Sequence, residues 1–304
     1  MLEGVSEDDL KSLEELLEHG NEHIPTRDEI GTINVNQFKL PAVIHRYKMA
    51  AENQLSWFYA ANGVLLNNTG FVLMNYHLPF QLDSYSDSNN EEGVQEVSNN
   101  DVLLLYDPTT SLISMVKVLG YSKKHDITLG KINVPDSINI PPTHITKKDP
   151  EFPDVTLTIG VDPFDAALPN QNQLIGAGDF ISTEGEITGF MQTEYPTTST
   201  GKLNLTVPAG RVYDGALNEQ GEEILNYGDH IFLSEAMLGR HNNVIISGNS
   251  GSPVYSALHE LVGLTKAHFS GEIQGQQFDG TIFLGPKIIR NIIRDYITEV
   301  RNTR

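Results

Sequence analysis

Residues 61–78 contain the pattern that most restricts the fold of this chain: two short apolar runs separated by four turn-forming residues. The turn is Asn-Asn-Thr-Gly at 67–70, and the second run leads to His77. Asparagine and glycine tolerate the left-handed backbone of tight turns, so two short apolar runs around such a turn are typical of an antiparallel hairpin. We therefore predict a β-hairpin that ends at His77.

The length and the absence of cysteine set further limits. With 304 residues, the chain can bury a large core, and it contains no cysteine. Neither disulfides nor thiolate metal sites can therefore hold the fold together, and its stability must come from packing.

A helix is expected near each end of the sequence. Ser6 with Asp9 three residues later forms a capping signal, leucines then recur at helical spacing, and Gly20 ends the pattern. After Gly285 and Pro286, isoleucines recur on one helical face as far as Val300. The first helix is expected to pack on the protein body, while covering a site or binding a partner are the alternatives.

The segment 245–254 places Ser250 between Asn249 and Gly251, with Gly248 just before and a proline shortly after. Glycines allow a turn tight enough to expose the serine hydroxyl and to point the amides of Gly248 and Ser250 at one oxygen, as a nucleophilic serine requires. The same residue types also dominate ordinary turns, so this segment needs a base and an acid elsewhere in the chain.

His77 and Asp126 supply that base and acid in the order His, Asp, Ser. Asp126 lies just before the apolar run 127–132, whereas Asp101 and Asp107 lack an equally good context. The alternatives are a structural histidine after a strand and a solvated turn aspartate.

These motifs resemble those of trypsin-like serine proteases, especially the HtrA and glutamyl endopeptidase branches. The likeness covers pieces of residues 57–300, including the hairpin to His77, the strand after Asp126, the serine turn and the segment from 281 to the last helix. Thr128 and Gly130 depart from the family pattern. We expect a protein of this kind without the PDZ domain of the HtrA branch.

The resemblance implies an all-β fold of two six-stranded antiparallel β-barrels, with an N-terminal and a C-terminal helix. We expect an N-terminal extension over 1–34, a first barrel with His77 and Asp126 over 35–145, and a second barrel with Ser250 plus the last helix over 146–304. An extra hairpin is expected within 191–229.

The implied activity is that of a serine endopeptidase without a cofactor. Ser250 would be the nucleophile, His77 the general base, Asp126 the group that orients the imidazole, and Gly248 and Ser250 the oxyanion hole. The alternative is a catalytically silent or latent trypsin-like module that binds a protein partner.

Three residues are candidates for the S1 pocket, which receives the P1 side chain: Val244, Thr265 and His268. Val244 stands where trypsin has the acid that binds lysine or arginine, so a small or medium apolar P1 residue is expected first and an acidic one second. Asn249 cannot form the ion pair of activated digestive zymogens, which leaves loops, the N-terminal helix or a regulatory protein partner for any control of activity.

The formal net charge of −20 argues against nucleic acid as a partner, because phosphate binding needs a basic surface. The sequence has no apolar run long enough for a membrane span, so no membrane partner is expected. It opens with an acidic stretch unlike a secretion signal, so we expect a cytoplasmic location, or secretion if the chain is a trimmed mature form.

We expect a polypeptide substrate and no metal, although two patterns in the sequence are candidate metal sites. Glu91, Glu92 and Glu96 in the acidic stretch 83–100 are candidate calcium ligands, with a solvated loop as the alternative. His19 and His23 have the spacing of a zinc motif, but Gly20 and Asn21 end the helix that would have to hold them.

Overall fold

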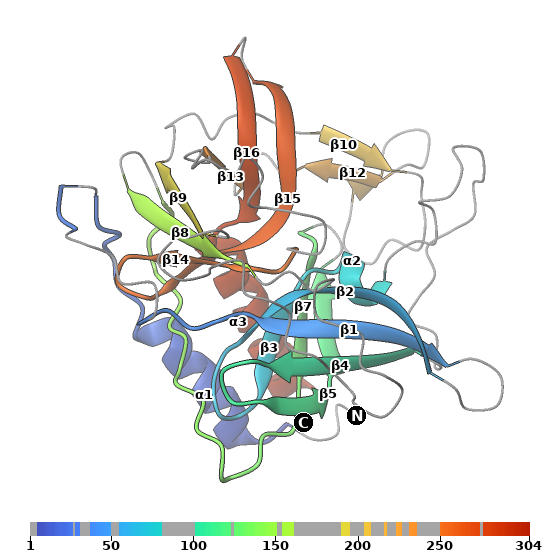
Figure 1. Ribbon diagram of the computed structural model, residues 1–304. Helices are drawn as coiled ribbons and strands as arrows, with labels where there is room; N and C mark the ends of the chain where they lie inside the picture. The colour runs from blue at the N-terminus through green and yellow to red at the C-terminus, as the bar shows by residue number, and fades with distance from the viewer. Residues whose placement is uncertain are drawn as a thin grey trace.

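The computed structural model describes fourteen stretches of the chain, here called the described residues: 5–26, 28–30, 37–49, 55–80, 101–122, 125–150, 154–160, 190–194, 204–207, 216–217, 223–226, 231–235, 250–273 and 276–304. Within them the protein is mostly β, with antiparallel sheets and few helices (Figure 1). The all-β prediction with a helix near each end is confirmed at this level.

Sheet 1 has seven strands in the order β5-β4-β1-β2-β3-β7-β6. Their bounds are β1 Ala42–Met49, β2 Leu55–Leu65, β3 Phe71–Met74, β4 Asp101–Asp107, β5 Leu112–Met115, β6 Lys117–Ser122 and β7 Ile127–Lys131. The edge strands β5 and β6 are separated only by Val116, whose N–H donates to the carbonyl of Leu103 at 2.8 Å. One bent stretch of chain therefore pairs with β4 at one end and with β7 at the other, so the sheet curls round on itself.

Sheet 2 has six strands in the order β13-β16-β15-β14-β8-β9. Their bounds are β8 Val155–Ile159, β9 Phe190–Glu194, β13 Ile231–Glu235, β14 Pro253–Ser256, β15 Leu261–Ile273 and β16 Gln276–Leu284. The edge strands β9 and β13 have Cα atoms within 8 Å of each other, so this sheet also curls. Because sheet 1 has seven strands, two barrels of six strands each are not confirmed.

A third, small sheet lies within the predicted insertion 191–229. It consists of β10 Asn204–Val207, β11 Ala216–Leu217 and β12 Glu223–Asn226, in the order β10-β12-β11. The consecutive strands β11 and β12 pair antiparallel, as the strands of the expected extra hairpin would, and β10 pairs with the other edge of β12.

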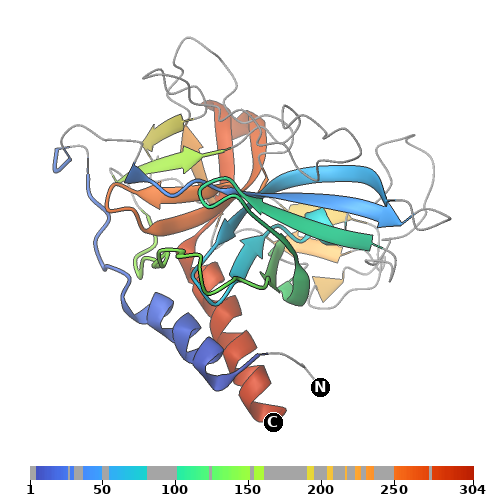
Figure 2. The same cartoon turned by 60° about the horizontal axis from the view of Figure 1, so that its bottom comes forward.

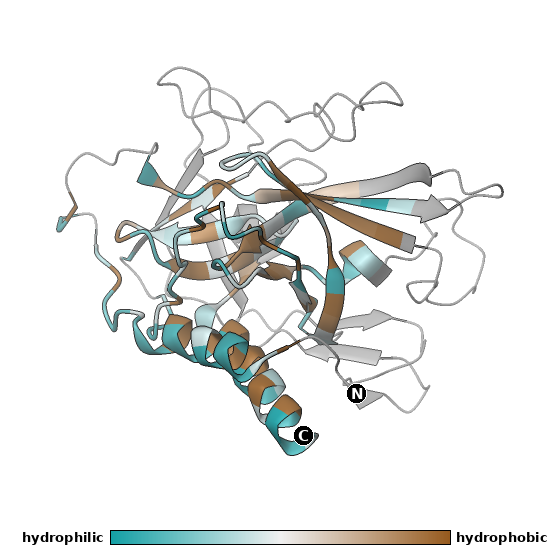
Figure 3. Cartoon of the chain, turned by 90° about the horizontal axis from the view of Figure 1, so that it is seen from below, coloured by the Kyte–Doolittle hydropathy of each residue, from teal (hydrophilic) through white to brown (hydrophobic). Residues whose placement is uncertain are grey.

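The two long helices lie side by side under the sheets (Figure 2). α1 spans Glu7–Glu18 and starts with the expected capping box of Ser6 and Asp9, and α3 spans Pro286–Asn302. Each helix is amphipathic, as the alternation of brown and teal along them shows (Figure 3). Their buried residues join one core cluster with residues of both sheets: Leu10, Leu13, Leu16, Leu17, Ile288, Ile289, Ile293, Tyr296, Ile297 and Val300.

The helix at the N-terminus is therefore part of the main core rather than a cover over a site. Sheet 1 has a second core cluster of its own, which includes Ile44, Val72 and Leu105. The stretch 132–150 connects the sheets without a helix or strand, and the division into domains at 34 and 145 stays a prediction. Among the described residues, no helix is long and apolar enough to cross a membrane.

Candidate functional site

His77 lies at the start of a short helix, α2 (His77–Phe80), three residues after β3 ends. The hairpin that delivers it forms as predicted, with β2 and β3 joined by the turn at 67–70. Gly70 has a φ of 82°, and a Cβ there would lie 2.3 Å from the carbonyl oxygen of Ile132. Only glycine fits this turn, which explains why the sequence signal is strong.

Asp126 lies directly before β7, which pairs with β3. The register opposes Met74 to Thr128, so the chain leaving β3 and the chain entering β7 bring His77 and Asp126 together. Asp126 has a φ of 54°, and the side-chain amide of Asn75 donates to its carbonyl at 3.1 Å. Aspartate is one of the residues that tolerate the left-handed region, and the amide of Asn75 stabilises this turn.

The Asp126 carboxylate accepts hydrogen bonds from both the backbone and the ring of His77. The backbone N–H of His77 lies 3.0 Å from Oδ1, and the ring Nδ1 lies 3.0 Å from both Oδ1 and Oδ2. Because a carboxylate accepts, Nδ1 carries a proton, and in the neutral imidazole Nε2 then has the free lone pair. This is the tautomer that a general base needs.

Burial alone would raise the pKa of Asp126, whose side chain is 8% exposed. The charges of His77 and Lys266 and the hydrogen bonds from His77 outweigh burial and lower this pKa to about 2. Asp126 is therefore ionised across the physiological range and keeps the imidazole oriented.

Ser250 lies between the two sheets. Its carbonyl accepts the N–H of Asn62 on β2 at 2.9 Å, while the N–H of Gly251 donates to the carbonyl of Thr265 on β15 at 2.8 Å. Gly251 has a φ of 84°, and a Cβ there would lie 2.0 Å from the carbonyl oxygen of Asn62. The glycine after the serine thus allows the turn to approach sheet 1 closely.

The hydroxyl of Ser250 donates to the backbone carbonyl of Lys266 at 3.1 Å. Within the described residues, no hydrogen bond joins Ser250 to His77. The structure thus brings the histidine and the aspartate together, and the serine hydroxyl points to a different acceptor.

Lys266 is the extra residue of a β-bulge in β15. Thr265 pairs with Phe283 and Ala267 with Ile282, so Lys266 has no counterpart on β16. Its ammonium Nζ lies 3.5 Å from Oδ2 of Asp126, and its side chain is 15% exposed. A bulge re-aims the local chain, and here the residue contacts both the acid, through its ammonium, and the serine, through its carbonyl.

Sequence reasoning missed Lys266, Asn62 and Asn75. The available signal for Lys266 was a single charged residue in the apolar stretch 261–269, and for Asn62 and Asn75 a lone amide beside apolar strand residues. The contacts themselves join residues far apart in the sequence, and no local pattern encodes them.

Of the remaining predicted site residues, some lie outside the described residues and one is buried. Gly248 and Val244 lie outside the described residues, and so does the side chain of His268, whose backbone lies in β15 opposite Thr281. Thr265 is fully buried, and its N–H donates to the carbonyl of Ser252 at 2.8 Å.

The described part of the chain contains no group of three or more His, Cys, Asp or Glu side chains that could hold a metal ion. The candidate calcium ligands Glu91, Glu92 and Glu96 lie outside it. The ring of His19 contacts the carbonyl of Glu15, and that of His23 contacts the carboxylate of Glu29.

Comparison with known proteins finds similarity in structure. No model of a protein family matches the chain, and no curated protein does. Among solved structures, the chain is similar to the crystal structure of the serine endoprotease from Yersinia pestis. The identity is 16%, the TM-score is 0.45, and the match covers 89% of this chain and 68% of that chain.

Proposed function

We propose that this protein is a serine endopeptidase with a trypsin-like triad of Ser250, His77 and Asp126. The observation that carries the proposal is the His77–Asp126 pair, in which a buried, ionised carboxylate accepts the hydrogen bond of Nδ1 with an N–O distance of 3.0 Å. A carboxylate-oriented imidazole of this tautomer is the base that activates a serine. Ser250, in its tight turn between the sheets, is the serine that the sequence motif points to.

In the proposed reaction, Oγ of Ser250 attacks the carbonyl carbon of the scissile peptide bond and its proton passes to Nε2 of His77. The tetrahedral adduct collapses with cleavage of the C–N bond, and the imidazolium gives that proton to the leaving amine. Water then attacks the acyl-enzyme, with His77 again as base, which releases the acid product and restores the Ser250 hydroxyl. The charge of Asp126 stabilises the imidazolium in both steps.

The observed hydroxyl orientation fits a resting enzyme. To react, Ser250 must exchange its hydrogen bond to the Lys266 carbonyl for one to Nε2 of His77, and we expect this to occur by rotation about the Cα–Cβ bond of Ser250. Such a rotation has a low barrier compared with a rearrangement of backbone. The proposed oxyanion hole uses the amides of Gly248 and Ser250, each donor being worth about 3 kcal/mol in comparable enzymes.

For specificity, we propose a polypeptide substrate with a small or medium apolar P1 residue, with acidic P1 as the second choice. Val244 supports the first because it lacks the charge that would bind lysine or arginine. Profiling of cleavage sites in a peptide library decides between them: cuts after apolar residues support the first, and cuts after Glu or Asp support the second.

The second candidate function is a silent or latent module of the same fold that binds a protein partner. The hydrogen bond from Ser250 to Lys266 favours it, because that bond withholds the hydroxyl from the base.

A fluorophosphonate probe tests both candidates, since it reacts only with an activated serine. We expect covalent labelling of the wild type and none of Ser250→Ala, with peptide cleavage reduced by about four to six orders of magnitude in that variant. Ser252→Ala is the matched control, because Ser252 is fully buried and its hydroxyl has no partner within the described residues. If the folded wild type is not labelled, either with or without peptide substrates present, the silent module is favoured.

A further inference from the structure

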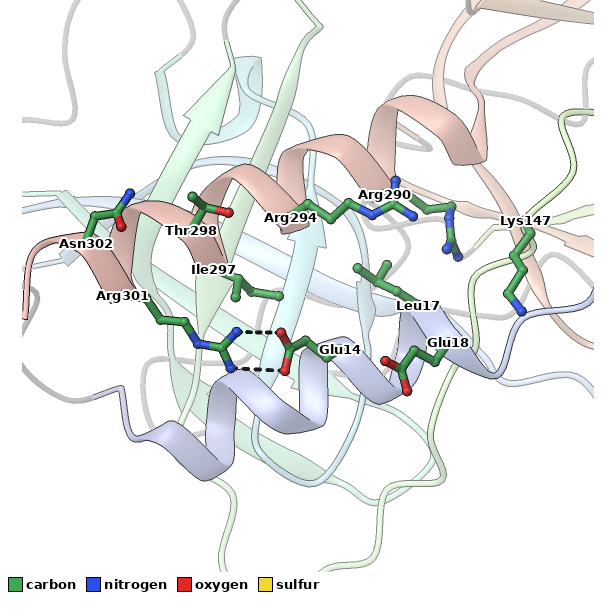
Figure 4. A pocket seen from close by; sticks show the side chains of 10 residues that line it. All are labelled: Glu14, Leu17, Glu18, Lys147, Arg290, Arg294, Ile297, Thr298, Arg301 and Asn302. Carbon is green, nitrogen blue, oxygen red and sulfur yellow. Dashed lines mark hydrogen bonds and ion pairs between the residues drawn. The ribbon is translucent and has the colours of Figure 1, made fainter.

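A groove of about 610 Å³ lies between α1 and α3 (Figure 4), and none of the proposed triad residues lines it. Leu17 and Ile297 give it an apolar floor. Its size falls within the range of small-molecule sites.

One end of the groove gathers positive charge. Arg290 and Arg294 of α3 and Lys147 of the inter-sheet stretch extend toward it, as Figure 4 shows. This grouping is unusual in a chain with 40 acidic and 20 basic residues, where cations have many carboxylates to pair with.

These three cations form no ion pair within the described residues. Arg290 is 7% exposed, and one of its terminal nitrogens donates to the carbonyl of Ile145 at 2.9 Å. Among the described residues, Arg294 forms one long side-chain hydrogen bond, of 3.5 Å, to Asn291. Within the part of the chain that the structure describes, several N–H donors of these guanidinium groups therefore have no partner.

The charge of Arg294 also acts on Arg290. Burial first, and then repulsion from Arg294, lower the pKa of Arg290. Two guanidinium groups within electrostatic range, one of them buried, cost free energy that a bound anion would recover.

The other end of the groove is already neutralised. Arg301 bonds to Glu14 at 2.6 and 3.0 Å and to Glu7 at 2.5 and 3.0 Å. Glu18 lines the groove without forming an ion pair in the described structure, so the three cations still exceed the local negative charge.

We propose that this groove binds a small organic phosphate, with its phosphate on Lys147, Arg290 and Arg294 and its apolar part on Leu17 and Ile297. Guanidinium forks match phosphate oxygens in a bidentate way, and a lysine adds a point charge. The proposal does not depend on the proteolytic activity.

Calorimetric titration of the full chain at low salt tests the site with three probes: phenyl phosphate, inorganic phosphate and phenol. We expect saturable binding of phenyl phosphate, weaker binding of inorganic phosphate, and none of phenol. Arg294→Gln and Lys147→Gln should each weaken the binding of phenyl phosphate by about tenfold, as expected for the loss of a charge-assisted hydrogen bond. Both residues make few contacts, so both variants should fold, which circular dichroism checks.

Arg301→Gln is the matched control, since it changes the charge by the same amount at the opposite end of the groove (Figure 4), and its affinity should stay closer to the wild type than that of Arg294→Gln or Lys147→Gln. The proposal is overturned if phenyl phosphate does not saturate, if Arg294→Gln and Lys147→Gln bind it as tightly as the wild type, or if Arg301→Gln weakens it as much as they do. If phenol binds as tightly as phenyl phosphate, the assignment of a phosphate site is overturned. If inorganic phosphate binds as tightly as phenyl phosphate, the assignment of an apolar subsite on Leu17 and Ile297 is overturned.

Discussion

Replacing Lys266 by methionine should raise the pKa of Asp126 by one unit or more. In the wild type, burial raises this pKa, while His77 and Lys266 together bring it down to about 2. Methionine keeps much of the side-chain volume and removes the ammonium that lies 3.5 Å from Oδ2. The carboxylate then keeps only His77 as a charged partner within the described residues.

The magnitude follows from that distance. At 3.5 Å, and with an effective dielectric constant of about 20 to 40, two opposite charges attract by about 2 to 5 kcal/mol. Neighbouring charges of this kind shift carboxyl pKa values by about 1 to 3 units in proteins. A rise from about 2 to 3 or higher is therefore expected for Asp126.

The direct assay is a ¹³C NMR titration of the Asp126 carboxyl carbon, assigned by its loss in Asp126→Asn. Lys266→Arg, which keeps the charge, should titrate near the wild type. Lys148→Met is the second control, because Lys148 pairs with a different buried aspartate, Asp154, at 3.1 Å. A midpoint in Lys266→Met within about 0.3 unit of the wild type, or below it, would refute the reasoning.

The same shift has a consequence for stability. A carboxyl whose pKa falls from 3.8 to about 2 on folding stabilises the protein by about 2 kcal/mol above pH 3.8, and this is lost as the pH falls through 2. In Lys266→Met the pKa of Asp126 is higher, so this carboxylate contributes less stability at neutral pH and less is lost on acidification. The free-energy difference between wild type and variant in urea unfolding should therefore narrow by about 1 kcal/mol between pH 6 and pH 2.

Two further predictions concern stability. Gly251→Ala should lower the free energy of unfolding by at least about 2 kcal/mol in urea denaturation, because its φ is 84° and the new Cβ would lie 2.0 Å from a backbone oxygen. Gly120→Ala is its control, since there the Cβ meets only a ring atom at 3.5 Å, and an equal loss in both would contradict the steric argument. In thermal unfolding, Leu13→Ala on α1 should lower the free energy of unfolding by about 2 to 5 kcal/mol, because Leu13 is fully buried. Arg301→Ala loses only exposed ion pairs and should unfold at a temperature close to that of the wild type. A larger loss for Arg301→Ala than for Leu13→Ala would mean that the ion pairs, and not the core, fix α1.

Local signals predicted the parts of the fold that depend on local chemistry. The hairpin turn at 67–70, the capping box at Ser6 and the helix after Pro286 each involve residues close in sequence. The strand count of sheet 1 was not predictable in this way. Only Val116 separates β5 from β6, and this break depends on the pairing of β5 with β4 and of β6 with β7.

The candidate site was predictable to the same degree. The motifs gave His77 and Asp126, which the register of β3 and β7 brings into contact. The orientation of the Ser250 hydroxyl was beyond sequence reasoning, because it depends on a carbonyl sixteen residues away that a bulge has turned. The roles of all three residues in catalysis stay predictions.

The bulge at Lys266 also bears on how such a site could change. In a regular strand, deleting one residue moves every later side chain to the opposite face of the sheet. Here Thr265 and Ala267 already face consecutive partners on β16, so the loss of Lys266 alone would leave the pairing on both sides in register. A deletion of this one residue would remove a cation from the acid and a carbonyl from the serine while sparing the ladder. The bulge thus makes the charge beside Asp126 a feature that a lineage can gain or lose in one step.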